Sequence, residues 1–286
     1  MLEQSLEPIG ILDLLHLQGA DQHRFKLVRH QEGRYDLHDF LRRDWLETYQ
    51  SFQSRPVFDN LDFIISFLGF GGTRARFAGV YQILGRRSGR LGKLPEGCPH
   101  SGWLELNYFY EMKRVVGFEE LEHRAVIDWG KGALAWHQWP KNKEVLEILP
   151  KGQLLRPFDD YLGFTLTYSE LRYLCSHPSA NREWRARLSA VAGVYLILAT
   201  TTGEQYVGSA TGLEGIWGRW STYADNGHGG NRLLQELVKN QRAYPDAFSY
   251  SILQVLPRTY AVGEVLKWEN LYKQKLGSRA VGLNDN

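Results

Sequence analysis

Two short apolar segments in the last third of the chain constrain its fold more than any other feature. Residues 192–200 read AGVYLILAT, residues 204–210 read EQYVGSA, and Thr-Thr-Gly lies between them. Segments of this kind, joined by a glycine-containing turn, predict a β-hairpin. Two helical segments, one strand and a last helix ending at Gly277 follow. This order predicts a small α/β domain in which a three-stranded antiparallel sheet is flanked by helices.

The chain before this hairpin has other patterns. Residues 10–50 read as mixed helix and loop. Residues 57–150 contain short aromatic strands separated by glycine turns, which predicts a small barrel or a strongly bent sheet. Thr167 and Glu170 then form the capping box of a helix, and a second helix follows. We therefore expect an α+β protein with an N-terminal β-rich domain, a helical connector and a C-terminal domain, spanning 1–165, 166–190 and 191–286.

Composition restricts the class of protein. The 286 residues are 43% hydrophobic, enough for two ordinary cores. A net charge of +2 permits nucleic-acid binding without requiring it. Cys98 and Cys175 are the only cysteines, too few for a disulfide framework or a cysteine-based zinc site. The sequence has no signal-peptide pattern and no apolar run near the ~20 residues of a membrane span, so we expect a cytoplasmic protein without a membrane partner.

The hairpin strands carry paired tyrosine motifs. GVY occupies residues 193–195 and YVG occupies 206–208, so the two tyrosines are eleven residues apart. These motifs resemble the paired motifs of the GIY-YIG nuclease superfamily. Four further positions match the family's pattern in order: Arg219, Tyr223, Glu269 and Asn284. The resemblance covers about 95 residues and implies that the C-terminal domain hydrolyses phosphodiester bonds with a divalent metal ion.

The residue types suit this chemistry. Phosphodiester hydrolysis needs an in-line water and charge neutralisation at the phosphorus. Glu269 can bind one hard divalent cation through oxygen, and we expect Mg²⁺ or Mn²⁺. Arg219 is a permanently charged fork that suits a phosphate. Tyr223 follows it by four residues, so both side chains lie on one helix face.

The resemblance also implies roles for the other matched residues. Tyr195 helps to activate or orient the attacking water, and Tyr206 supports the same phosphate. Because a free phenol has a pKa of about 10, Tyr195 would need the metal and Arg219 to act as a base. Asn284 tethers backbone or side chains and closes the site. One departure is the loop SATGLEGI, which puts Arg219 thirteen residues after Tyr206, farther than in many family members.

Two further residues are candidates for the same site. His228 lies in the glycine-rich segment 226–231, where it could touch a phosphate or act as a second acid or base. The alternative is a plain helix-to-helix turn with an exposed histidine. Lys273 follows Glu269 by one helical turn. It could bind a substrate phosphate or simply pair with the acid.

The N-terminal domain has features of a DNA-recognition module. Between residues 74 and 93 the sequence has no acidic residue, and its second half reads as a flexible basic loop suited to a phosphate backbone. The basic residues are Arg74, Arg76, Arg86, Arg87, Arg90 and Lys93. An aromatic-rich region follows, with Trp129, Trp136 and Trp139 beside the polar Asp128 and His137. Such rings can stack a base but more often fill a core.

These features together predict a two-domain, metal-dependent endonuclease whose N-terminal domain selects double-stranded DNA. A DNA-recognition domain joined to a nuclease domain fits a role in restriction or phage defence, and it also fits a nuclease that depends on a DNA modification. One active site cuts one strand, so a homodimer on DNA would allow double-strand cleavage. The alternatives are a structure-selective repair or recombination nuclease and a DNA-binding module that has lost activity.

Overall fold

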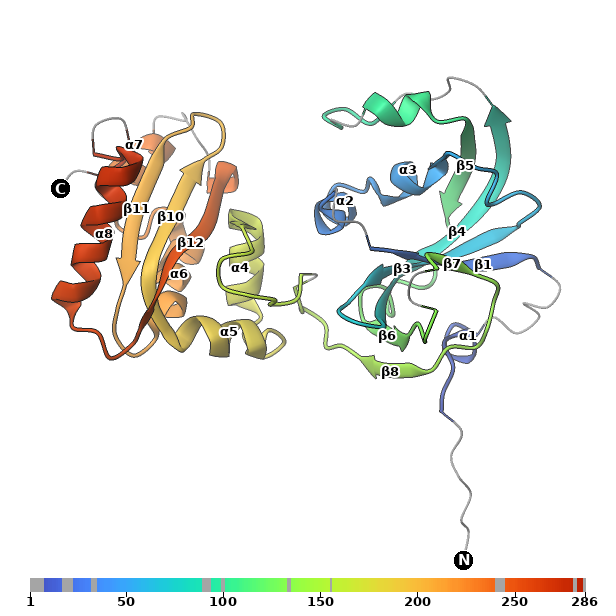
Figure 1. Cartoon of the computed structure of the whole chain (residues 1–286), viewed down its shortest axis with the longest axis horizontal. Helices are drawn as coiled ribbons and strands as arrows, with labels where there is room; N and C mark the ends of the chain where they lie inside the picture. The colour runs from blue at the N-terminus through green and yellow to red at the C-terminus, as the bar shows by residue number, and fades with distance from the viewer. Residues whose placement is uncertain are drawn as a thin grey trace, which may run out of the picture. The chain divides into compact units, whose positions relative to one another are not determined.

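The computed structural model describes residues 8–16, 23–31, 35–88, 94–98, 101–132, 135–154, 156–239, 245–279 and 282–284. The chain divides into two compact units, Met1–Pro150 and Lys151–Asn286 (Figure 1). The division falls before the expected connector, residues 166–190, whose two helices pack into the core of the second unit. No helix among the described residues is both long and apolar enough to cross a membrane.

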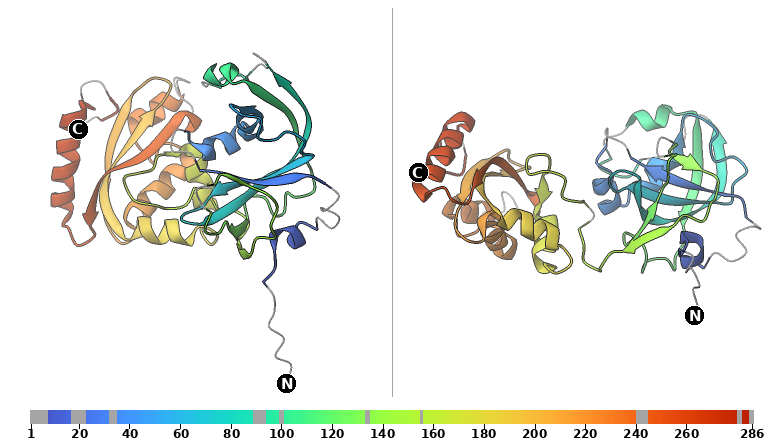
Figure 2. Two further views of the ribbon diagram at one scale, coloured as in Figure 1. Left: turned by 45° about the vertical axis from the view of Figure 1, so that its right-hand side comes forward. Right: turned by 60° about the horizontal axis from the view of Figure 1, so that its bottom comes forward.

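The first unit is a curled mixed sheet with short helices (Figures 1 and 2). Its strands are β1 (Phe25–His30), β2 (Phe52–Gln53), β3 (Phe63–Gly69), β4 (Arg74–Ser88), β5 (Tyr108–Arg114), β6 (Ala125–Asp128), β7 (His137–Gln138) and β8 (Val145–Ile148). Its helices are α1 (Ile11–Leu14), α2 (Leu37–Arg42), α3 (Leu46–Ser51) and the 3-10 helix η2 (Ser101–Glu105).

The curl of this sheet has a local cause. The strand order is β2-β5-β4-β3-β1-β7, and β6 joins β4 to β8. The register shifts between Ser66 and Phe67 and again between Ile83 and Gly85, and such bulges bend a strand and increase its twist. Within the described part of the unit no ladder joins the end strands β2 and β7. Of the two forms expected from the sequence, a small barrel and a strongly bent sheet, the structure has the bent sheet.

Strand β1 lies in the region expected to mix helix and loop. It pairs in parallel with β3, from Phe25 opposite Phe63 to His30 opposite Leu68. Its sequence, FKLVRH, does not look like a buried strand because basic residues interrupt the apolar ones. Arg29 is nevertheless only 2% exposed, and its guanidinium donates to the carbonyl of Gly72 at 2.6 Å. The buried charge is tolerated because backbone oxygens satisfy it.

The second unit contains a four-stranded antiparallel sheet in the order β11-β10-β12-β9. The expected sheet had three strands, and the fourth is only two residues long. The strands are β9 (Leu166–Thr167), β10 (Val191–Ala199), β11 (Gln205–Ala210) and β12 (Phe248–Pro257). The helices are α4 (Tyr168–Ser176), α5 (Arg182–Ser189), α6 (Gly215–Asn226), α7 (Arg232–Lys239), α8 (Val262–Leu276) and the 3-10 helix η3 (Pro245–Ala247).

Helices cover both faces of this sheet. The main core cluster joins one face to α4, α5, α6 and α7, and it includes Leu171, Trp184 and Trp220. A smaller cluster joins the other face to α8 through Val265, which packs against Ala192 and Leu256. The two faces of the hairpin β10–β11 therefore meet different helices, α6 on one side and α8 on the other.

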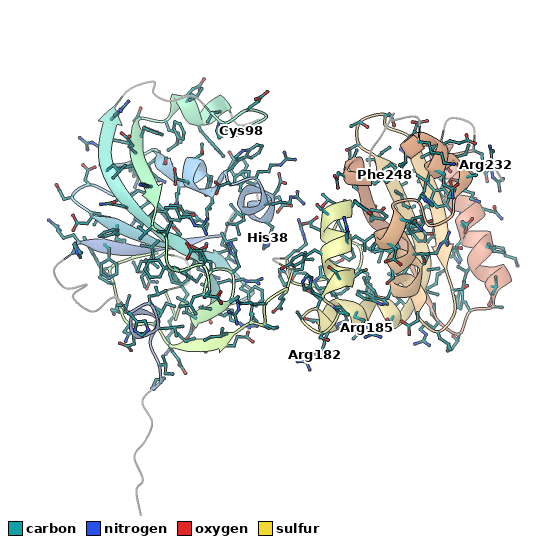
Figure 3. The ribbon with its side chains drawn as sticks, turned by 180° about the vertical axis from the view of Figure 1, so that it is seen from behind. His38, Cys98, Arg182, Arg185, Arg232 and Phe248 are labelled. Carbon is teal, nitrogen blue, oxygen red and sulfur yellow. The ribbon has the colours of Figure 1, made fainter. Side chains whose placement is uncertain are left out.

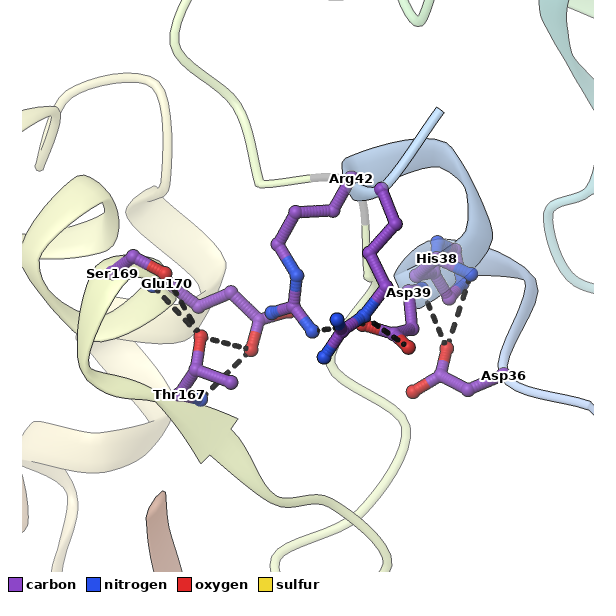
Figure 4. Close-up of polar contacts among 8 residues, drawn as sticks. Asp36, His38, Asp39, Arg42, Thr167, Ser169 and Glu170 are labelled. Carbon is purple, nitrogen blue, oxygen red and sulfur yellow. Dashed lines mark hydrogen bonds and ion pairs between the residues drawn. The ribbon is translucent and has the colours of Figure 1, made fainter. Parts of the chain in front are cut away.

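The capping box expected at the start of α4 is present (Figure 4). The Thr167 hydroxyl accepts from the backbone amide of Glu170 at 3.3 Å, and the Glu170 carboxylate accepts from the Thr167 amide at 2.8 Å. In the first unit, Asp36 caps α2 by accepting from the backbone amide of His38 at 3.0 Å. Caps of this kind satisfy amides that have no partner within their helix.

Candidate functional site

Tyr195 is the centre of the candidate site. It projects from β10 opposite Gly208 of β11, and its side chain is completely buried. A Cβ atom at position 208 would lie 2.5 Å from the Tyr195 hydroxyl, far inside van der Waals contact. The glycine of the YVG motif is therefore required because the tyrosine of the GVY motif lies over it.

Arg219 holds this tyrosine from α6. Its Nε donates to the Tyr195 hydroxyl at 3.2 Å, and one terminal nitrogen donates to the Tyr223 hydroxyl at 3.2 Å. The other terminal nitrogen donates to the carbonyl of Gly229 at 3.3 Å. Tyr195 and Tyr223 are themselves hydrogen-bonded at 3.1 Å. These three side chains, the tyrosine–arginine group, come together despite the thirteen residues between Tyr206 and Arg219.

The guanidinium in this group keeps free donors. A guanidinium carries five N–H groups in a planar fork. The bonds to Tyr195, Tyr223 and Gly229 use three of them, which leaves one on each terminal nitrogen. The residue is only partly buried. Arg219 can therefore hold its neighbours and still present a two-pronged contact to a phosphate.

Burial raises the pKa of the two tyrosines. For Tyr195, burial outweighs the opposing influence of Arg219 on the pKa, and the neighbouring Tyr206 raises it further. Burial likewise raises the pKa of Tyr223 above its usual range. Both phenols are therefore neutral at physiological pH, and the guanidinium does not make Tyr195 a base in this structure. The completely buried Tyr195 hydroxyl instead contributes as a neutral partner that positions Arg219.

The segment 226–231 forms a turn that supports the arginine. Gly229 has a φ of +55° and lies so close to the Tyr223 ring that a Cβ atom would be 2.5 Å from it. The glycine carbonyl also accepts from Arg219. His228 is half-buried, and its Nδ1 accepts from the Gly230 amide at 3.1 Å. This bond fixes the tautomer with the proton on Nε2.

Tyr206 and Asn284 complete the hairpin side of the site. The Tyr206 ring lies on the same face as Tyr195, with ring centres 6.4 Å apart. The Asn284 side chain accepts from the Val207 amide at 2.9 Å and donates to the Val207 carbonyl at 2.8 Å. Asn284 thus tethers the backbone of β11 between the tyrosine and the glycine of the YVG motif.

Glu269 lies against the other face of the hairpin. Its carboxylate accepts from the Ser209 hydroxyl and forms an ion pair with Lys273, with Oε1 2.7 Å from Nζ. Because side chains alternate along a strand, Ser209 and Gly208 point to opposite faces of β11. The glutamate–lysine pair (Glu269 and Lys273) and the tyrosine–arginine group therefore lie on opposite faces of β11, at the adjacent residues Ser209 and Gly208. No hydrogen bond or ion pair joins them among the residues that the structure describes.

The donor set fits a cation held by one protein carboxylate. No three His, Cys, Asp or Glu side chains converge within the described ranges. Magnesium usually keeps several waters and needs one or two carboxylates in addition to phosphate oxygens. Each carboxylate oxygen has two lone pairs, and Ser209 and Lys273 engage one oxygen each. Glu269 can therefore still accept a cation, provided that substrate completes the coordination.

Of the basic residues in the expected loop, Arg86 and Arg87 lie in strand β4, which also contains Arg74 and Arg76. Arg76 is 3% exposed and donates to the carbonyl of His123, so it cannot reach a phosphate. The exposed arginines pair with acids: Arg74 with Glu147, Arg86 with Asp59, and Arg87 with Glu111. Exposed pairs of this kind are worth about 0–1 kcal/mol, so a phosphate can displace the acids. Arg90 and Lys93 lie outside the described residues.

The aromatic region of this unit divides into core and surface. Trp129 is fully buried, and its indole donates to the carbonyl of Ala135 at 3.0 Å. Trp136 and Trp139 are 37% and 57% exposed. His137 is half-buried. Only the exposed tryptophans are placed to stack on a ligand.

Two further features of the second unit were missed from the sequence. Ser209 holds Glu269, and the hydroxyl residue directly after YVG was the available signal. Helix α5 exposes Arg182, Arg185 and Arg187 (Figure 3 labels the first two). The signal in the sequence is their spacing of three and two residues, although the pattern of this segment by itself predicts only a helix. These arginines add a basic surface to the unit that carries the tyrosine–arginine group.

Comparison with known proteins gives a partial likeness. No family model matches the sequence, and no curated protein matches it. Among solved structures, the chain is similar to the catalytic domain of intron endonuclease I-TevI in a mutant form, with 27% identity and a TM-score of 0.28 over 34% of this chain and 94% of that one. It is also similar to the catalytic domain of the homing endonuclease I-TevI, with 29% identity and a TM-score of 0.27 over 32% and 96%.

The close approach at Gly208 predicts a specific instability. Gly208→Ala should lower the free energy of unfolding by about 1–3 kcal/mol, because a buried tyrosine cannot move away from the new methyl group. Gly263→Ala is the control: it lies in helix α8 and no atom lies within 4 Å of its Cβ position, so the change should not destabilise the protein and should stabilise it by at most about 1 kcal/mol. Urea unfolding followed by circular dichroism measures both. Equal stabilities would show that the Tyr195 ring does not depend on the glycine.

Proposed function

We propose that the chain is a DNA endonuclease that hydrolyses phosphodiester bonds with a divalent cation in its second unit. The observation that carries this proposal is Arg219, which is anchored by two buried phenols and still has two N–H donors for a phosphate. A structural arginine would use its donors internally, and a solvent-exposed one would not be held by buried hydroxyls. The preorganised fork is what electrostatic stabilisation of a developing phosphorane charge requires.

The division of labour follows from the contacts. Arg219 binds the scissile phosphate through its free donors. Tyr195, a neutral and completely buried phenol bonded to Tyr223, holds Arg219 in position for the phosphate, and Tyr206 borders the same face. His228 has its Nε2–H free of the turn that binds Nδ1, so it can donate a hydrogen bond to a leaving oxygen. Asn284 keeps β11 in place beneath them.

Glu269 is the residue that would hold the cation, Mg²⁺ or Mn²⁺. When bound, the cation supplies charge neutralisation at the phosphate and lowers the pKa of water. Ser209 positions the carboxylate from β11. Residues 283–284 cover the outer edge of β11 at Gln205 and Val207. The next residue of β11 whose backbone points to this outer edge is Ser209. There a phosphate can contact both the tyrosine–arginine group and the glutamate–lysine pair.

The first unit is proposed to select the DNA. Arg74, Arg86 and Arg87 are exposed on it, and Trp136 and Trp139 are available for stacking. None of these residues belongs to the site assigned to hydrolysis. A separate unit of this kind fits a nuclease of restriction or phage defence that recognises double-stranded DNA through its own surface, and it also fits a modification-dependent nuclease. Cleavage of both strands would then use a homodimer.

The cation assignment predicts the effect of Glu269→Gln. The amide is a poor ligand for a hard cation, so cleavage of plasmid DNA in magnesium should fall by about 100-fold or more. DNA binding, measured by a mobility shift without any divalent cation, should stay within a few-fold because the phosphate contacts remain. Glu264→Gln, at the exposed start of the same helix, is the control. If Glu269→Gln cleaved DNA at the wild-type rate, Glu269 would not be the cation ligand.

The fork geometry predicts that Arg219→Lys is nearly as damaging as Arg219→Ala. A lysine cannot reach Tyr195, Tyr223 and a phosphate together, because it has a single nitrogen. Both variants should lose about 100-fold or more in single-turnover cleavage rate. Arg232→Lys, an exposed change on α7, should cleave normally. An active Lys variant would mean that position 219 supplies only charge.

The two-unit arrangement predicts the behaviour of a fragment spanning Lys151–Asn286. It should fold alone because it contains its whole core, including Leu171 and Trp184, which the expected domain of residues 191–286 lacks. It should cut DNA with little selectivity, since its contacts are mainly to phosphates. The measurement compares fragment and full chain on one phage genome, modified and unmodified. If the fragment gives the same discrete bands at similar rates, the first unit is not the selector.

A further inference from the structure

Lys273 is a buried cation placed against the carboxylate proposed to bind metal. Its Nζ lies 2.7 Å from Oε1 of Glu269, and the two side chains are only 4% and 13% exposed. The residues are one turn apart on α8 with the acid first, which is the favourable order on a helix. Before any metal arrives, this carboxylate already has a positive partner.

The pair differs from the surface pairs of the same unit. Arg232 and Glu236 have the same spacing on α7 and approach to 2.8 Å, but their side chains are 65% and 50% exposed. A lysine on a helix usually extends its ammonium into water. Taking a charge out of water costs several kcal/mol unless a partner compensates. The burial of Lys273 therefore distinguishes its ion pair with Glu269 from an exposed pair, which solvent screens.

We infer that Lys273 competes with the divalent cation for Glu269, so that the cation binds tightly only when DNA supplies phosphate oxygens. The inference rests on the proposed function, in which Glu269 is the metal ligand. An ammonium next to the carboxylate neutralises most of the charge that attracts a cation and repels the cation directly. A phosphate restores the missing negative charge and provides the further oxygens that magnesium needs.

The consequence is a coupling between metal and substrate. If DNA raises the affinity for the cation, the cation must raise the affinity for DNA by the same factor, because the coupling free energy is shared. The protein would then carry little metal between cleavage events. Lys273 acts here as a positioning residue through Glu269, not as a group that touches the reacting atoms.

The test measures binding of Mn²⁺ alone to the full chain by electron paramagnetic resonance, without DNA. Lys273→Met keeps an unbranched side chain, one atom shorter, and removes its charge, so it should bind Mn²⁺ about tenfold more tightly than wild type or better. Lys273→Arg retains the charge and should bind as weakly as wild type. Lys267→Met is the control for charge in general, since Lys267 is exposed on the same helix, and it should shift the affinity by less than about twofold.

A second measurement adds a phosphorothioate duplex that resists cleavage. Wild type should gain about tenfold or more in Mn²⁺ affinity, and Lys273→Met should gain much less. If Lys273→Met binds Mn²⁺ no better than wild type while Glu269→Gln abolishes binding, the competition is wrong and the metal site stands. If Glu269→Gln leaves binding unchanged, the metal assignment itself fails. Should the Met variant not fold, Lys273→Gln gives the same comparison.

Discussion

The candidate site depends on one close approach, that of the Tyr195 ring to a strand residue without a side chain. Gly208 lets the ring lie flat against β11, with its hydroxyl where α6 can reach it. Arg219 and Tyr223 each form a hydrogen bond to that hydroxyl, and they also form one to each other. Any side chain at position 208 would push the ring away and separate all three. The GVY and YVG motifs thus form a single packing arrangement, to which β10 contributes the tyrosine and β11 the glycine.

This arrangement explains why the second unit could largely be predicted from its sequence. Hairpin, helices and the capping box at Thr167 arise from patterns within a few residues of each other. The positions of Arg219 and Tyr223 follow from the helical repeat. What could not be predicted was the side of the strand on which Glu269 approaches, because that depends on how α8 packs against the sheet. Its partner Ser209 was missed for the same reason.

The first unit resisted prediction because its pairings join distant segments. Strand β1 is buried between β3 and β7 although its sequence contains Lys26 and Arg29. Backbone oxygens from residues more than forty positions away make this burial acceptable. Arg76 shows the same effect: in the sequence it belongs to a basic run, but in the sheet it faces inward. A basic run shows how much charge is present, not which side chains reach the surface.

The bond between Asn284 and Val207 has a consequence for self-association. β11 is the last strand of its sheet, and bare strand edges recruit strands from other molecules. A single amide side chain, which carries both a donor and an acceptor, takes the place of a neighbouring strand there. Two copies of the second unit could join along this stretch only by first expelling Asn284. Any association of two copies of this unit would therefore have to use some surface other than this stretch of β11.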